Sequence, residues 1–171
     1  ETARNIARRL HEINRQRGEL TAAMEAQALA RIEQLAPDAS TLPFGLCLFD
    51  PEWHQGVVGI IAGRLKERLN RPVIVFAADR NGKIKGSGRS VPGMHLRDVL
   101  AEVATQNPGL ISHFGGHAMA AGLTLAMEHF AAFNQAFDAE TRQWLSDDDL
   151  QGRLLSDGEL APAEFSLEIA E

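Results

Sequence analysis

The segment that most constrains the fold is the run Val-Ile-Val-Phe-Ala at residues 73–77. A short, unbroken apolar run is typical of a strand buried on both faces, and such a strand needs covering structure above and below its sheet. Asp-Arg-Asn-Gly follows at 79–82, and Asn-Gly favours a tight hairpin turn, which predicts a second strand over 83–90. The neighbouring sequence therefore has to supply helices that cover this hairpin.

Hydrophobic periodicity supplies those helices. Helices are expected over 3–36, where Pro37 ends the first one, and over 55–69, 95–104 and 128–145; further strands are expected over 45–49 and 123–125. The last helix is expected to bury Phe130, Phe133, Phe137 and Leu145. This order predicts an α/β fold in which a mixed β-sheet is flanked by helices and preceded by a long connecting helix with arginines on its polar side.

Cysteine content and hydropathy limit the setting in which the chain works. Cys47 is the only cysteine of the 171 residues, so the chain can form neither an internal disulfide nor a thiolate metal cluster, which favours a reducing, cytoplasmic location. The sequence has no apolar run of about 18 residues and no signal-peptide pattern, so no membrane partner is indicated. Because the chain begins with glutamate inside a helical pattern, we expect it to be a fragment of a longer protein.

The net charge of −6 is unevenly distributed. Residues 1–137 carry 15 Lys and Arg against 13 Asp and Glu, whereas residues 138–171 carry 2 against 10. Between residues 80 and 97 there are five basic side chains and no acidic one, which predicts a local phosphate-binding surface. An ordinary solvated hairpin face is an equally good interpretation of this segment by itself.

Phe-Gly-Gly-His-Ala-Met-Ala-Ala-Gly at 114–122 has little side-chain bulk, so another molecule can approach its main chain. Exposed N–H groups there could hold an anion such as a phosphate, and His117 would add one directed hydrogen bond or charge. The alternative is a tightly packed turn in which His117 is a structural histidine.

Two further segments combine glycines with polar groups. Gly-Ser-Gly-Arg-Ser at 86–90 offers two hydroxyls and a guanidinium, which match a terminal phosphate. Residues 53–64 place a histidine beside a helix N-terminus, which favours anions, while Gly59 and Gly63 would also allow close packing of that helix on the sheet. All three segments lie at expected strand ends or junctions, where ligands commonly bind.

Taken in order, His-Gln-Gly-Val-Val-Gly-Ile at 54–60, the 86–90 segment and the 114–122 segment resemble the RecJ family of single-stranded-DNA-specific exonucleases in the DHH phosphoesterase superfamily. The 114–122 segment is shared across that superfamily and with relatives of alanyl-tRNA synthetase. The 54–60 and 86–90 segments narrow the resemblance to the RecJ family. It covers nearly the whole chain. The divisions that it implies are an interdomain connecting helix over 1–37, a DHH-associated domain over 42–146, and the start of a truncated oligonucleotide-binding domain over 151–171.

The resemblance implies part of an enzyme that hydrolyses phosphodiester bonds in single-stranded DNA, processively from 5′ to 3′, in recombination and repair. Its Mg²⁺ or Mn²⁺ would be bound by aspartates and histidines of the DHH half of the catalytic core, which is named for an Asp-His-His motif. No Asp-His-His occurs in this sequence, and its six histidines are scattered singly. Because a two-metal site needs several converging carboxylate and imidazole ligands, we expect no catalytic metal site here and no activity of this chain by itself.

The same resemblance implies a role in holding single-stranded DNA with a 5′-phosphate end. Ser87 and Arg89, with Ser90 beside them, would bind the terminal phosphate. His117 and the amides of Gly115 and Gly116 would contact the scissile or a neighbouring phosphate. His54 and Arg64 are expected as strand contacts, and Trp53 is expected to pack in the core rather than to stack on a base.

Two other functions are compatible with these residues. One is a phosphodiesterase of the same superfamily that acts on short oligonucleotides or cyclic dinucleotides, but the sequence that continues after Gln151 argues against it. The other is a non-catalytic RNA-binding module, and the long arginine-bearing helix at the start argues instead for a missing upstream half. The sequence does not indicate the oligomeric state or any partner among other repair proteins.

Overall fold

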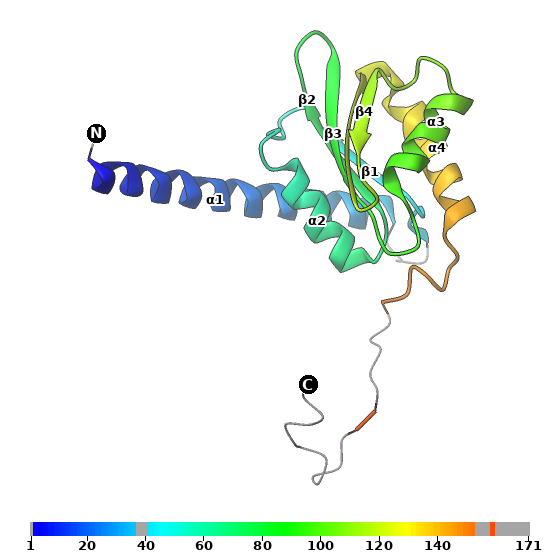
Figure 1. The fold of residues 1–171 in the computed structure, drawn as a ribbon, viewed down its shortest axis with the longest axis horizontal. Helices are drawn as coiled ribbons and strands as arrows, with labels where there is room; N and C mark the ends of the chain where they lie inside the picture. The colour runs from blue at the N-terminus through cyan, green and yellow to red at the C-terminus, as the bar shows by residue number, and fades with distance from the viewer. Residues whose placement is uncertain (1, 37–40, 153–157, 160–171) are drawn as a thin grey trace.

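The computed structural model describes residues 2–36, 41–152 and 158–159. It contains one five-stranded sheet with helices on both faces and a long first helix that extends well beyond the sheet (Figure 1). The elements are α1 Ala3–Leu35, β1 Leu46–Asp50, α2 Val58–Leu69, β2 Val73–Ala78, β3 Lys83–Arg89, α3 Leu96–Gln106, β4 His113–Gly116, β5 Ala120–Ala126, a 3₁₀ turn Met127–His129 and α4 Phe130–Trp144. The predicted α/β class with a preceding long helix is therefore confirmed.

The strand order is β1-β2-β3-β5-β4, with β1 parallel to β2 and every other pair antiparallel. The run at 73–77 forms most of β2 and is completely buried, as its unbroken apolar pattern predicts. Asn81 and Gly82 both have positive φ, at 60° and 70°, the backbone that a tight Asn-Gly hairpin turn requires. The sheet is therefore mixed, and its hairpin is the predicted one.

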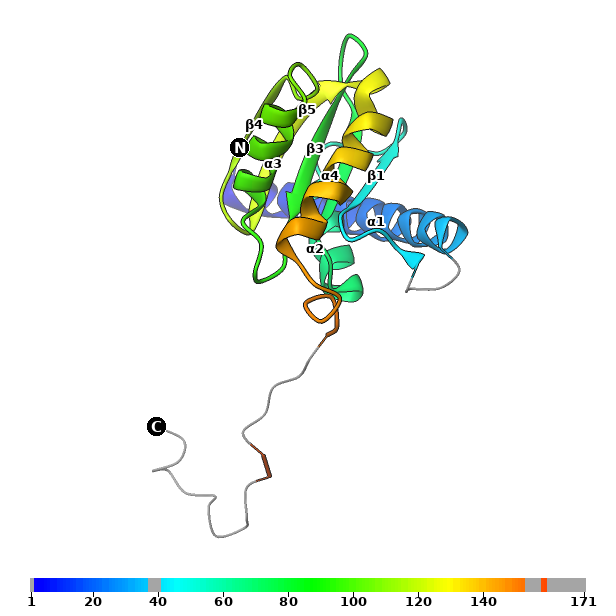
Figure 2. The ribbon, with the colours of Figure 1, turned by 90° about the vertical axis from the view of Figure 1, so that its right-hand side faces the viewer.

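Two apolar clusters cover the two faces of the sheet. On one face α3 and α4 pack over β2, β3 and β5, as Figure 2 shows with both helices in front of the strands. Phe133 lies between Phe76, edge to face at 5.7 Å, and Phe137, stacked at 5.9 Å. On the other face α2 and the C-terminal half of α1 pack over β1 and β2. Phe130, predicted to be buried, is only half-buried at the start of α4.

The largest difference from the sequence prediction lies in the glycine-rich segment. We expected only a short strand over 123–125 after it, whereas β5 begins at Ala120 and β4 pairs with it as a second hairpin. Glycine and alanine have low strand propensity and give no alternating pattern, so the pairing here comes from the neighbouring strand rather than from local preference. Helix α2 also begins at Val58, three residues later than predicted, because turns occupy residues 51–57.

Helix α1 is anchored by its second half. Met24, Ala28 and Ile32 are buried against the sheet, whereas Ile6 and Leu10 in the first half are exposed. No helix in the described ranges is long and apolar enough to cross a membrane. The predicted start of an oligonucleotide-binding domain falls mostly on residues outside the described ranges.

Candidate nucleic-acid interface

Strands β3, β5 and β4 bring the separate sequence motifs into register on one face of the sheet. Ser87 pairs with Gly122, and Gly122 pairs with Gly115, so these three residues form one row across the three strands. Because side chains alternate along a strand, the rows two residues away point to the same side. We call this surface the open face; it consists of Lys85, Ser87, Arg89, His113, Gly115, His117, Ala120, Gly122 and Thr124.

The open face has room for a ligand because no helix of the described chain covers its β5 and β4 part. Gly115, Gly122 and His113 are all exposed. A Cβ added at Gly115 would meet nothing within 4 Å, and one added at Gly122 would meet only the Gly86 carbonyl oxygen, at 3.7 Å. Packing therefore does not require glycine at either position, but the missing side chains leave the backbone there accessible to a ligand.

Gly116 differs from Gly115. Its φ is +146°, and a Cβ there would overlap the Ala120 carbonyl oxygen and lie 2.5 Å from the Ala121 Cα. The hairpin itself thus requires this glycine. The packed-turn interpretation therefore applies to Gly116, and the open-surface interpretation applies to Gly115.

The amides of this hairpin alternate in direction. His117 N–H donates to the Ala120 carbonyl at 2.8 Å, which makes this a hydrogen-bonded pair of the ladder. By the same alternation, the Gly115 amide faces β5 and the Gly116 amide faces away from it. Gly115 thus contributes space rather than a donor. The His117 ring is exposed, and its side chain makes no hydrogen bond to any described residue, so it is not a buried structural histidine.

The first turn of α2 packs directly on Ser87 and Arg89. A Cβ added at Gly59 would lie 2.9 Å from Ser87 Oγ and 3.2 Å from Arg89 Nη2. Arg89 Nη1 donates to Ser87 Oγ at 3.3 Å and to the Gly88 carbonyl at 2.9 Å. The close packing predicted for Gly59 is confirmed, whereas Gly63 has nothing within 4 Å of an added Cβ, so the same role predicted for it is wrong.

This junction has the chemistry of an anion site. Among the described residues, no side chain caps the N-terminus of α2. The Val57 and Ile60 N–H groups donate to backbone carbonyls, which leaves the N–H groups of Val58 and Gly59 for another acceptor. The positive end of the helix dipole lies there, next to a hydroxyl and a guanidinium. A helix N-terminus, Ser87 and Arg89 therefore converge at one edge of the open face.

One carboxylate lies close to the basic side chains of β3. Asp79 accepts from Lys85 Nζ at 3.1 Å and from Gln55 Nε2 at 3.2 Å. The backbone N–H of Arg80, followed by the Gln55 and Lys85 side chains, lowers the pKa of Asp79 from its ordinary 3.8 to about 2. Its negative charge partly offsets Lys85, while Lys83 and Arg89 leave the strand basic.

Four predicted residues have contacts other than the junction of α2 with Ser87 and Arg89. Ser90 is fully buried and donates from its hydroxyl to the Met94 carbonyl at 2.9 Å, so the structure contradicts its expected place at the phosphate. The Arg64 guanidinium forms an ion pair with Glu25 of α1 at 2.6 Å.

The other two, His54 and Trp53, lie in the turns before α2. His54 is exposed, and its Nδ1 accepts from the Gly56 N–H at 3.0 Å. Trp53 is 4% exposed and donates to Gln27 Oε1, which confirms packing rather than base stacking.

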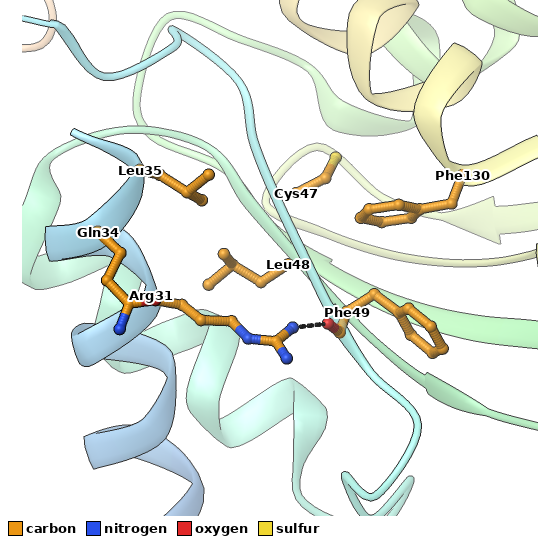
Figure 3. A pocket seen from close by; sticks show the side chains of 7 residues that line it. All are labelled: Arg31, Gln34, Leu35, Cys47, Leu48, Phe49 and Phe130. Atoms are coloured by element: carbon orange, nitrogen blue, oxygen red, sulfur yellow. Dashed lines mark hydrogen bonds between the residues drawn. The ribbon is translucent and has the colours of Figure 1, made fainter.

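A depression lies beside β1, which is the edge strand at the other end of the sheet from β4, and Figure 3 shows the side chains that line it. It has a volume of about 350 Å³ and is lined mainly by apolar side chains, among them Leu35, Leu48 and Phe130. Among its described lining residues the one cation, Arg31, already donates to the Phe49 carbonyl and forms an ion pair with Asp50 at 2.6 Å. Apart from this paired cation, the only polar side chain among the described lining residues is the Gln34 amide, so the cavity has no group with the charge to match a phosphate.

Residues 42–143 match the family model described as the DHHA1 domain. The chain belongs to the DHHA1 domain family. It is 48% identical over 169 residues to the single-stranded-DNA-specific exonuclease RecJ of Escherichia coli (strain K12). That alignment covers 99% of this chain and 29% of the E. coli protein. It is 35% identical over 127 residues to RecJ of Bacillus subtilis (strain 168), in an alignment that covers 74% of this chain and 15% of the B. subtilis protein.

Solved structures give the same relationship. Exonuclease RecJ bound to manganese matches with a TM-score of 0.69 at 31% identity, over 84% of this chain and 33% of that one. RecJ of Thermus thermophilus in complex with Mg²⁺ matches with a TM-score of 0.61 at 32% identity, over 80% of this chain and 20% of that one. Nearly all of this DHHA1 chain is aligned with the E. coli and Haemophilus influenzae RecJ proteins, but it spans only about 29% of their length.

The described part of the DHHA1 chain does not fit a divalent metal site. Within residues 2–36, 41–152 and 158–159, no three His, Cys, Asp or Glu side chains are grouped so that they could hold a metal ion. The expectation that catalytic metals are bound outside this chain stays a prediction.

Sequence reasoning missed part of the open face of this DHHA1 chain. His113 belongs to it only because β4 pairs with β5, and β4 was not predicted. Gly122 and Thr124 belong to it because β5 pairs with β3, and the predicted strand over 123–125 did not reach Gly122. Lys85 was counted in the basic segment, but its position beside Thr124 follows from the register of β3 with β5. The alternation of residues 83–89 was the signal that could have placed Lys83, Lys85, Ser87 and Arg89 on one side.

Proposed function

We propose that the chain is the substrate-binding part of a 5′-to-3′ single-stranded-DNA exonuclease that acts in recombination and repair. The convergence of Ser87, Arg89 and the N-terminus of α2 beside an uncovered sheet face carries this proposal. Close similarity to RecJ exonucleases supports the reaction class. Because bacterial recombination and repair take place on chromosomal DNA in the cytoplasm, we also place the protein there.

In this proposal Ser87 and Arg89 bind the 5′-terminal phosphate. The guanidinium supplies charge-assisted hydrogen bonds, each worth about 1.5–3 kcal/mol, and the α2 N-terminus adds its dipole. His117 and the outward amide of Gly116 contact a neighbouring phosphate, and Gly115 leaves space for it. His54 and Arg64 are peripheral strand contacts, since each already has an intramolecular partner.

Divalent metal ions would supply the chemistry of hydrolysis, bound by a part of the protein outside this chain. Two of the solved relatives are RecJ bound to manganese and to Mg²⁺. In a metal-dependent nuclease the metal ions activate water and stabilise the charge on the cleaved phosphate. The 171-residue chain alone is therefore expected to bind DNA without cleaving it.

Fluorescence anisotropy of labelled single-stranded DNA tests the proposal, with matched 5′-phosphate and 5′-hydroxyl ends and a salt series. The wild-type chain should favour the phosphate and lose affinity as salt rises. Arg89→Ala should abolish most of that preference, about tenfold or more. Arg97→Ala is the matched control: although Arg97 was counted in the basic segment at 80–97, it lies on α3, which covers the opposite face of the sheet, and its side chain is 56% exposed. A preference that survives Arg89→Ala contradicts the proposal.

A further inference from the structure

The open face extends beyond the residues assigned to the terminal phosphate. Two residues along β3 from Ser87, Lys85 pairs with Thr124 of β5, and Thr124 pairs with His113 of β4. This second row points to the same side as the Ser87 row, about 6–7 Å from it along the strands. It is therefore placed to meet the continuation of any strand that begins at Ser87 and Arg89.

The side chains of this second row are available to a ligand. The Lys85 side chain is about half exposed, and His113 is exposed. Neither the His113 ring nor the Thr124 hydroxyl has a hydrogen-bond partner within the described ranges. Lysine donates to phosphate from a long, flexible stem, while hydroxyl and imidazole groups donate at shorter range.

A polar hollow adjoins the row at the β2–β3 hairpin. It has a volume of about 850 Å³ and is lined by Gln55, Ala78, Asp79, Arg80, Asn81, Lys83 and Lys85. Its basic side chains outnumber its single carboxylate, Asp79, which forms an ion pair with Lys85. The electrostatic surroundings of the row therefore favour an anion, with Asp79 as a competitor for the Lys85 ammonium.

We propose that Lys85, Thr124 and His113 form a second phosphate subsite, which holds a backbone phosphate of the nucleotides that follow the 5′ end. This inference rests on the proposed function, since it needs a strand anchored at Ser87 and Arg89. Asp79 limits the strength of the subsite by pairing with Lys85. Removing Lys85 and removing the Asp79 charge should thus change DNA affinity in opposite directions.

A length series of 5′-phosphorylated oligothymidylates tests the subsite, from the mononucleotide to the hexanucleotide, with binding to the 171-residue chain measured by calorimetry. The wild-type affinity should rise with the added phosphates. Lys85→Gln and His113→Asn should each lose most of that rise, about tenfold for Lys85, while the 5′-phosphate preference remains. Asp79→Asn should bind the longer oligomers more tightly, and Lys66→Gln on α2 should match wild type.

The variants separate failure of the subsite from failure of the proposed function. If Lys85→Gln and His113→Asn bind every length as wild type does while Arg89→Ala loses the phosphate preference, the subsite is overturned and the proposed function stands. If Lys85→Gln and Asp79→Asn weaken binding equally and lower the melting temperature together, their ion pair is structural and the subsite is again overturned. If the wild-type chain shows neither phosphate preference nor length dependence, the proposed function fails as well.

Discussion

The α2-side face of the sheet has two halves that differ in what covers them. Over β1 and β2 the face presents Leu48, Val75 and Ala77, and α2 buries it with Ile61 and Leu65. Over β5 and β4 the same face presents glycine, alanine, threonine and histidine, and no described helix covers it. The sheet is continuous, so the side chains decide which half becomes core and which half stays open to a ligand.

Truncation of a covering residue should show the largest effect. Ile61→Ala in α2 removes a fully buried side chain and should lower the free energy of unfolding by about 2–5 kcal/mol, because a cavity remains. Thr124→Ala on the open face should change it by no more than about 0.5 kcal/mol. Urea unfolding followed by circular dichroism measures both. Equal losses would mean that the open half is packed like the covered half.

The neighbouring glycines of β4 sharpen the same contrast. Gly116→Ala should lower the free energy of unfolding by about 1–3 kcal/mol, since its positive φ and the overlap with Ala120 leave no room for a Cβ. Gly115→Ala should leave stability near wild type and weaken binding of 5′-phosphorylated DNA severalfold. Thermal unfolding and anisotropy on the same samples separate the two. A Gly115→Ala chain that binds DNA normally would remove this residue from the interface.

The smallest expected effect is on acid stability. Because the pKa of Asp79 is lowered to about 2 in the folded chain, its carboxylate contributes stability that is fully present above its unfolded pKa, near 4. That contribution is lost as pH falls from about 4 toward 2, and Asp79→Asn should lack it. Thermal unfolding between about pH 2 and 6, with carbon NMR of the Asp79 carboxyl, measures it. A carboxyl that titrates at its ordinary pKa would show that the Arg80, Gln55 and Lys85 contacts do not form in solution.

Strongly patterned elements could be predicted from the sequence. The apolar run at 73–77, the Asn-Gly turn and the helix that carries Phe133 and Phe137 all form where local preference and burial agree. Strand β4 could not be predicted, because its glycines have no preference for a strand and it is held by pairing with β5.

The residue types of the candidate site could be predicted from the sequence, but only some of the residues that form it could. Serine, arginine and glycine in one short segment indicated a phosphate, but the burial of Ser90 is set by α3 and its preceding turn, which local sequence does not reveal. Lys85 and His113 are far apart in the chain and lie in one row only because of strand register. Long-range pairing is the part that a single sequence does not encode locally.

NMR of the isotopically labelled chain, titrated with a thymidine dinucleotide that carries or lacks a 5′-phosphate, tests the central claim most directly. If the open face and the α2 N-terminus form the site, the phosphorylated ligand should shift the amide signals of Gly59, Ser87 and Gly122, and the unphosphorylated one should shift them far less. Shifts confined to the cavity around Leu35 and Phe49, or no difference between the two ligands, would contradict the account.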